Sequence, residues 1–200
     1  MTLLDRAAPE TFRERAIPVL ETARLILRAP RFEDAEAIAT LVNDRRIAEN
    51  TLRIPYPYTL ADAQAFLTAA NTDDGEIVFL MTTQTGGIVG CCGIAKLDGE
   101  TPEIGYWLGV PFWGKGYATE AARAVIDHAF GELGYDTLLA GVRVSNPASR
   151  RVLEKCGFQW TGVGLYRINA LKSSAPIDRF RLERRIWSAI KGWGRLKKVM

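Results

Sequence analysis

The chain has 200 residues, 48% of them hydrophobic and 24% charged, with a formal net charge of +3. This composition is typical of one soluble globular domain with a sizeable core, and it excludes the disordered and fibrous classes of protein. No apolar run is long enough to cross a bilayer, and three cysteines with one histidine give neither a disulfide framework nor metal-ligand spacing. We therefore expect no membrane segment and no metal.

The basic excess belongs to the C-terminal end. Residues 191–200 contain four basic residues and no acid, and removing those four leaves 22 basic against 23 acidic residues in the rest of the chain. We predict a solvated basic tail at residues 188–200, because its charges are too sparse to favour binding to nucleic acid. Residues 1–19 are a predicted N-terminal extension that does not resemble a signal peptide, which favours a cytoplasmic protein.

The first predicted elements are a strand at residues 24–28, two short helices within 32–50 and a third helix at 60–70. Strands at 77–83 and 88–95 follow, and the Gln84-Thr-Gly-Gly turn between them is typical of a β-hairpin. Cys91 and Cys92 lie on opposite faces of the second hairpin strand, and we interpret both, with Cys156, as small core residues.

A glycine-rich turn follows the next predicted strand, Glu103 to Leu108. Gly114 and Gly116 precede a helix that starts near Tyr117. A helix start without side chains presents free backbone N–H groups and the positive end of the helix dipole, which suits a phosphate or pyrophosphate. A single G-x-G is often only a tight turn, and the dinucleotide fingerprint G-x-G-x-x-G is incomplete here.

The C-terminal half alternates helices and strands. The helix over 118–130 should end near residues 131–134, and a strand at 137–144 follows. Asn146-Pro147 starts another helix, which stops at Gly157, and a strand begins at 158–161. We expect a loop at 167–177 and a closing strand at 179–185. Hairpins early in the chain and alternation later predict a mixed sheet.

Three motifs together resemble the GNAT superfamily of acyl-CoA N-acyltransferases, and within it the ribosomal-protein-alanine N-acetyltransferase type. They are Glu103-Ile-Gly-Tyr-Trp-Leu, Trp113-Gly-Lys-Gly-Tyr-Ala-Thr-Glu-Ala and Asn146-Pro-Ala-Ser-Arg-Arg-Val-Leu-Glu-Lys-Cys-Gly-Phe. The resemblance covers residues 20–187. It implies an α/β (α+β) fold, in which a mixed, mostly antiparallel central sheet with splayed parallel strands is flanked by helices.

The resemblance implies transfer of an acetyl group from acetyl-CoA to a primary amine in a ternary complex, with a protein N-terminal α-amine as the first acceptor to consider. The residues that it implies for binding acetyl-CoA are Trp107, Leu108, Gly109, Val110, Trp113, Gly114, Lys115, Gly116, Tyr117, Ala118, Thr119, Asn146 and Ser149. Trp113 replaces the family's usual Gln or Arg, but the cradle is mostly main chain.

Gly109 within a strand indicates a β-bulge or a close approach of backbone. In the family a bulge here splays two parallel strands, and the cofactor inserts between them. The backbone N–H near Leu108 is then the expected donor to the thioester oxygen.

Glu103 is the candidate base. A protein α-amine is about 10–20% neutral at pH 7, whereas a lysine amine is about 0.04% neutral, so an α-amine needs only a weak base. Many family members reprotonate the thiolate with a Tyr where this chain has Leu153. In the similar ribosomal-protein enzymes a serine takes that role, and Ser149 matches its position. Ser149 and Asn146 also suit helix capping, and both roles stay open.

Tyr56, Tyr58, Trp160 and Tyr166 lie in segments that border the acceptor cleft in similar proteins, although aromatic residues are also common as core or rim packing. Other functions stay open as well: acetylation of a small amine, a non-catalytic acyl-CoA-binding sensor, and, least favoured, a nucleotide-binding protein. A homodimer is compatible with the sequence, and the sequence does not decide it.

Overall fold

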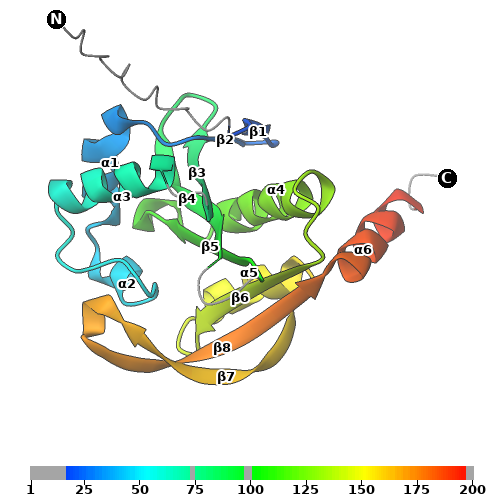
Figure 1. Ribbon diagram of the computed structural model, residues 1–200. Helices are drawn as coiled ribbons and strands as arrows, with labels where there is room; N and C mark the ends of the chain where they lie inside the picture. Colours follow the sequence, from blue (N-terminus) through cyan, green and yellow to red (C-terminus); the bar gives the residue numbers. More distant parts are fainter. Residues whose placement is uncertain (1–16, 73–74, 97–100, 197–200) are drawn as a thin grey trace, which may run out of the picture.

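The computed structural model describes residues 17–72, 75–96 and 101–196 (Figure 1). The strands are β1 (Leu20–Glu21), β2 (Leu25–Arg28), β3 (Glu76–Thr83), β4 (Ile88–Ala95), β5 (Glu103–Leu108), β6 (Thr137–Arg143), β7 (Gln159–Ile168) and β8 (Ser173–Glu183). The α-helices are α1 (Ala35–Val42), α2 (Arg45–Ala48), α3 (Leu60–Thr72), α4 (Tyr117–Gly131), α5 (Pro147–Lys155) and α6 (Arg184–Leu196). Short 3₁₀ turns lie at Phe32–Asp34, Val110–Phe112 and Asn169–Leu171. None of the helices in these ranges is long and apolar enough to cross a bilayer.

The strands form one mixed sheet in the order β1-β2-β3-β4-β5-β6-β8-β7. Neighbouring strands are antiparallel, except that β5 and β6 are parallel and pair only at Glu103 and Leu139. Leu139 N–H donates to the carbonyl of Pro102 at 2.9 Å, and beyond this point the two strands diverge. The predicted mixed sheet with splayed parallel strands is confirmed, and the split between β5 and β6 opens toward their carboxyl ends.

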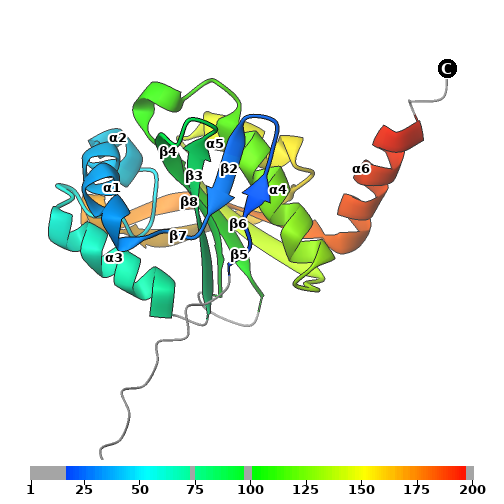
Figure 2. The same cartoon turned by 90° about the horizontal axis from the view of Figure 1, so that it is seen from above.

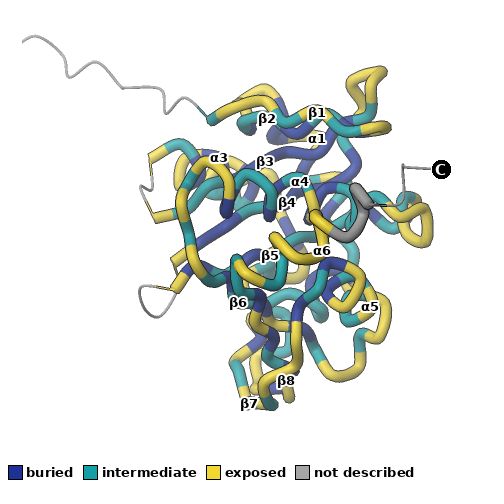
Figure 3. The backbone as a smooth tube through the Cα atoms, turned by 90° about the vertical axis from the view of Figure 1, so that its right-hand side faces the viewer, coloured by how far each residue is buried: buried dark blue, intermediate teal, exposed yellow. Residues whose placement is uncertain are grey.

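Helices cover both faces of the sheet. Figure 2 shows α1, α2 and α3 on one side, with α4 and α5 on the other. Side chains that alternate along the strands are buried in two separate cores, one on each face of the sheet. In one core Phe130 of α4 packs with Ile104, and in the other Leu67 of α3 packs with Leu80. The central strands between these layers are largely buried, as the dark blue segments in Figure 3 show. The split between β5 and β6 therefore lies between two helical layers.

Most elements predicted from the sequence are present. The two short helices within 32–50, the third helix, the hairpin of β3 and β4, and the helices that begin after Gly116 and Asn146 are all confirmed. The loop expected at residues 167–177 is wrong, because β7 and β8 continue as a paired hairpin to Ile168 and Ser173. Ile168, Ala175 and Ile177 are buried there in a small cluster with Leu52, a long-range contact that stabilises the strands despite Pro176.

The predicted domain boundaries can be compared with the structure only in part. Residues 1–16 of the expected extension lie outside the described residues, and β1 begins at Leu20. At the other end α6 runs across the boundary expected at residue 187. Trp187 of α6 contacts the Phe130 ring of α4, and its indole N–H donates a hydrogen bond to the Asp127 carboxylate at 2.6 Å. The first turn of α6 therefore packs against the rest of the domain. The division of the chain into extension, domain and tail stays a prediction.

Asp34→Asn is expected to lower the free energy of unfolding by about 2 kcal/mol. Asp34 is 6% exposed; Arg28 donates to both of its oxygens at 2.7 and 2.8 Å, and Arg31 N–H donates at 2.7 Å. Substitution removes one charge from this buried pair. Urea unfolding at neutral pH measures the loss. Glu33→Gln is the control, because its ion pair with Arg31 is exposed and should contribute about 0.5 kcal/mol or less.

The same pair predicts a pH dependence of stability. Burial by itself would raise the pKa of Asp34, but the hydrogen bonds from Arg28 and Arg31 outweigh it, and the pKa lies below its usual value. A lowered folded-state pKa stabilises the protein above the unfolded value of about 3.9 and loses this effect as the pH falls through the folded value. The difference between the wild type and Asp34→Asn should therefore shrink below about pH 4. A difference that stays constant down to pH 2 would contradict this account.

Candidate active site

The glycine turn before α4 has the geometry of an anion-binding loop. Gly114 and Gly116 have φ of +74° and +82°, in the left-handed region that favours glycine. Gly116 is the N-cap of the 15-residue helix α4, and no side chain caps this helix start. The first N–H groups of α4 are thus left for a ligand, at the positive end of the helix dipole.

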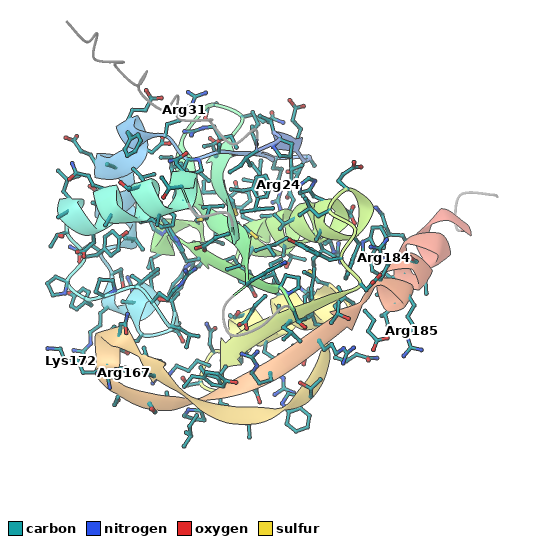
Figure 4. All side chains as sticks on the ribbon, viewed as in Figure 1. Arg24, Arg31, Arg167, Lys172, Arg184 and Arg185 are labelled. Carbon is teal, nitrogen blue, oxygen red and sulfur yellow. The ribbon has the colours of Figure 1, made fainter. Side chains whose placement is uncertain are left out.

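A salt bridge from Arg24, just before β2, holds this loop in place. Arg24, labelled in Figure 4, donates to the carbonyl of Lys115 at 2.9 Å and pairs with Glu120 of α4 at 2.6 Å. Burial by itself would raise the pKa of Glu120, but hydrogen bonds from Thr22 and Arg24 outweigh it and lower the pKa. Glu120 therefore stays ionised near neutral pH and fixes Arg24 against the loop.

A groove of about 420 Å³ runs from this loop between α4 and α5 to the split in the sheet. Its basic side chains, Arg151 and Lys155, come from α5. The predicted cofactor residues that line it are Trp107, Leu108, Trp113, Gly114, Gly116, Ala118, Thr119, Asn146 and Ser149. Sequence reasoning missed the two basic residues, although their i, i+4 spacing in the helix after Asn146 was a usable signal.

The remaining predicted cofactor residues lie beside the groove. Gly109 is buried, and Val110 packs against the core under α1 and α3. The ammonium of Lys115 lies 5.5 Å from the Phe112 ring centroid, and the Tyr117 ring lies 4.8 Å from the Arg24 guanidinium. A direct contact of these four residues with acetyl-CoA stays a prediction.

The bulge expected at Gly109 is wrong, and the close approach is confirmed. The β4–β5 register runs without a shift from Gly90 and Leu108 to Ala95 and Glu103, and β5 ends before Gly109. A Cβ at Gly109 would lie 2.2 Å from Cδ1 of Leu41, so contact with α1 accounts for the glycine. The strands β5 and β6 instead separate after their single pair at Glu103 and Leu139, while β6 stays paired with β8 along its whole length.

The backbone of β5 presents donors to the split. Gly109 N–H donates to Val89 of β4 at 2.9 Å. Because donors alternate along an antiparallel ladder, the N–H groups of Leu108 and Tyr106 point away from β4, toward the diverging β6. The Trp113 indole donates to the Leu108 carbonyl at 2.8 Å and occupies that acceptor. Leu108 N–H thus faces the side expected for it, and Tyr106 N–H faces the same side.

A second cavity, of about 480 Å³, lies on the other side of the split, under α1 and α3. It shares five wall residues with the groove: Asn50, Thr51, Tyr106, Trp107 and Ser149. The two spaces therefore meet where β5 and β6 diverge. A ligand in the groove and a ligand in the cavity would have their ends next to each other at this point.

Glu103 lies in the wall of the second cavity. Its Oε2 accepts a hydrogen bond from Arg179 of β8 at 3.0 Å, and the Arg179 guanidinium lies 5.1 Å from the Tyr166 ring centroid. Glu103, Gly105 and Trp107 alternate along β5, so they share the face that carries this cavity. The predicted base is therefore on the cavity side of the split.

Tyr106 and Ser149 meet at the junction of the two spaces. The Tyr106 hydroxyl lies 2.8 Å from Ser149 Oγ and also donates to the Ser149 carbonyl at 3.2 Å. Ser149 N–H in turn donates to Asn146 Oδ1 at 3.1 Å, so the expected N-cap is confirmed. Burial raises the pKa of Tyr106 well above its usual value, and its hydroxyl keeps its proton at neutral pH. Leu153, at the family's usual Tyr position, is 1% exposed.

Sequence reasoning missed Tyr106. The period of two in a strand was the available signal, because it places Tyr106 on the opposite face of β5 from Glu103. Its partner Ser149 is 43 residues away in the chain, and no local pattern links the two.

The predicted acceptor aromatics are not all in one place. Tyr58 lines the second cavity and is 8% exposed. Tyr56, Trp160 and Tyr166 lie outside its wall. Trp160 donates to Asp178 at 2.8 Å, on the face of the sheet that carries α5. Tyr166 packs near Arg179, next to Glu103. A role for these three in acceptor binding stays a prediction.

A split mixed sheet with an uncapped, glycine-rich helix start on one side and a cavity of small-ligand size on the other is typical of an acyltransferase that uses a phosphate-bearing acyl carrier. The family model described as an acetyltransferase (GNAT) domain matches residues 24–159. The chain belongs to the GNAT acetyltransferase family, whose acyl donor is acetyl-CoA.

Relatives and solved structures agree with this family. The N-acetyltransferase p20 of Bacillus licheniformis is 30% identical over 150 residues, which are 72% of this chain and 84% of p20. RimJ of Mycobacterium smegmatis, solved with CoA-disulfide, has a similar fold, with a TM-score of 0.74 at 19% identity, covering 84% of this chain and 88% of RimJ. Spermidine N-acetyltransferase of Vibrio cholerae, solved with CoA and spermine, has a TM-score of 0.70 at 21% identity. The match covers 82% of this chain and 98% of the spermidine N-acetyltransferase.

Proposed function

We propose that this N-acetyltransferase acts on a protein N-terminal α-amine. The observation that carries the proposal is a carboxylate in the wall of the second cavity: Glu103, which forms an ion pair with Arg179. A carboxylate is a weak base. It is adequate for an α-amine, which is about 10–20% neutral at pH 7, and poorly suited to a lysine-type amine, which is about 0.04% neutral.

The groove fits acetyl-CoA. A diphosphate matches the uncapped start of α4, the two positive-φ glycines leave the backbone free to approach it, and Arg151 and Lys155 add positive charge along the wall. Bound there, acetyl-CoA would supply a thioester carbonyl open to attack by an amine. The N–H groups of Tyr106 and Leu108 are the donors placed to stabilise negative charge on that carbonyl oxygen.

Two side chains handle protons on opposite faces of the split. Glu103 accepts a proton from the attacking amine, directly or through water. Ser149 Oγ donates a hydrogen bond to the departing sulfur when the Tyr106 hydroxyl, 2.8 Å away, donates its proton to Ser149 Oγ instead of to the Ser149 carbonyl. Tyr106 thereby orients the Ser149 hydroxyl. This division replaces the Tyr that the family commonly places at the position of Leu153.

Calorimetric titration with acetyl-CoA, followed by thiol-release assays over N-terminal peptides and small amines, tests the function. Micromolar binding with release on peptides supports the proposal. Release on polyamines or other small amines alone would move the enzyme to small-molecule acetylation. Binding without any release would favour an acyl-CoA sensor.

Glu103→Gln is expected to lower kcat/KM for an α-amine peptide by about tenfold at pH 7, because only about 10–20% of the amine is neutral without a base. The loss should nearly vanish at pH 9, where the amine is neutral by itself. Thiol release measured from pH 6.5 to 9 checks this. Gln keeps an acceptor for Arg179, so the charge is the main change.

Glu76→Gln is the matched control for this variant. Glu76 is a second carboxylate of the same cavity wall and is paired with Arg53 at 2.6 Å. It should leave the pH profile unchanged. A loss in Glu103→Gln that is equal at every pH would rule out Glu103 as the base.

A further inference from the structure

The part of the second cavity under α3 has an apolar wall. Phe66 of α3 and Trp107 of β5 are partly buried there and pack against a small cluster of Ala70, Val78 and Cys91. Ile54, Tyr58 and the α1 residues Ile38 and Val42 extend the same wall. Figure 2 shows α3 lying along this face of the sheet.

The cavity has space under α3 because several of the α3 side chains that line it are small. Ala65, Ala69 and Ala70 all line the cavity, on the face of the helix that also carries Phe66. An alanine side chain ends at Cβ, so these positions leave space between the helix and the strands. A total volume of about 480 Å³ lies within the usual range for small-ligand pockets.

Among the described wall residues, every charged side chain except Asp62 lies in an ion pair. Glu76 accepts two hydrogen bonds from Arg53, at 2.6 and 3.0 Å. Asp62 accepts from Thr59 at 2.6 Å, and Glu103 accepts from Arg179 at 3.0 Å. The last of them, Arg143, donates to the Glu49 carbonyl at 3.1 Å.

The polar groups deeper in this wall are neutral. Burial raises the pKa of the Tyr58 hydroxyl to about 12 and that of the Cys91 thiol to about 12. A polyamine would need several carboxylates to match its several cations, but two of the three carboxylates in this wall, Glu76 and Glu103, are neutralised by arginines, which leaves Asp62. An acceptor with one amine and an apolar body matches the wall better.

We propose that the acceptor carries, next to its reacting amine, one apolar group of leucine or phenylalanine size that binds between α3 and the β3–β5 face of the sheet. This inference rests on the proposed function. In an N-terminal peptide the apolar group is the first side chain, and in a small molecule it is the body of a primary amine.

The test measures thiol release with peptides that differ only in their first residue, which is Phe, Leu, Ser or Asp. Phenethylamine and spermidine are the small-molecule acceptors. The Phe and Leu peptides should exceed the Ser peptide in kcat/KM by about ten- to hundredfold, as expected for burial of one apolar side chain. Phenethylamine used as well as the Phe peptide would identify a small molecule as the source of the same apolar group.

Ala69→Leu fills the proposed site. Ala69 is exposed at the cavity wall, so the larger side chain enters the cavity without displacing core residues. We expect it to remove the preference for Phe over Ser by raising KM for the Phe peptide, with acetyl-CoA affinity unchanged. Ala61→Leu is the matched control: it is the same substitution at an exposed position of α3 outside the cavity wall, and it should keep the preference.

Several results would overturn the inference. A preference for the Ser or Asp peptide would overturn this inference and leave the proposed function standing, and so would an unchanged preference in Ala69→Leu. A preference for spermidine over every peptide would overturn the proposed function as well. Release with none of the acceptors, despite acetyl-CoA binding, would overturn the proposed function and this inference together.

Discussion

Gly116→Glu is expected to abolish measurable binding of acetyl-CoA, with a loss of affinity of at least about 100-fold. Gly116 has φ of +82°, and a Cβ added there would lie 3.3 Å from Nη2 of Arg24. The new side chain would strain the loop and place a negative charge where the diphosphate is expected. Calorimetric titration gives the affinity, and a thermal melt reports whether the variant is folded.

Gly134→Glu is the control that distinguishes the effect of a negative charge at the glycine turn from the effect of backbone strain at a positive-φ glycine. Gly134 has φ of +73°, lies just beyond the opposite end of α4, and has no atom within 4 Å of an added Cβ. This variant should carry a similar conformational cost and bind acetyl-CoA normally. Normal affinity in Gly116→Glu would show that the Gly114–Gly116 turn is only a turn, and a different phosphate site would have to be sought.

Ser149→Ala should lower kcat by about 100-fold, in the range typical of a lost proton donor, while KM for the peptide and affinity for acetyl-CoA stay unchanged. The substitution leaves the Ser149 N–H, and so the hydrogen bond to Asn146 that caps α5. Helix stability is therefore retained, and the change reports on the hydroxyl. Ser145→Ala, at an exposed position outside both cavity walls, is the control and should turn over normally.

Tyr106→Phe tests the second half of this arrangement. It removes the hydroxyl at 2.8 Å from Ser149 Oγ and keeps the ring in the core. If Tyr106 acts by orienting Ser149, its loss should cost about tenfold in kcat and nothing further in the Ser149→Ala background. Two additive losses would instead indicate that each hydroxyl acts on the substrate independently.

Much of the fold could be predicted because its signals are local. Glycines with positive φ mark the turn before α4, and Asn146-Pro147 marks the start of α5 through a cap and a preset φ. The outer half of the β7–β8 hairpin was not predicted, because the contacts that stabilise it are not local. It is stabilised by burial of Ile168 and Ile177 against Leu52, which is far away in the chain.

Residue types at fixed spacing were enough to predict the glycine turn, the helix that follows it and, through three motifs, the family of the protein. Which side chains meet where β5 and β6 diverge depends on contacts that exist only in the folded chain. Tyr106 reaches Ser149 across 43 residues, and Arg179 reaches Glu103 across 76. Such contacts depend on strand register and on the divergence of β5 from β6, and the burial of two separate cores sets both.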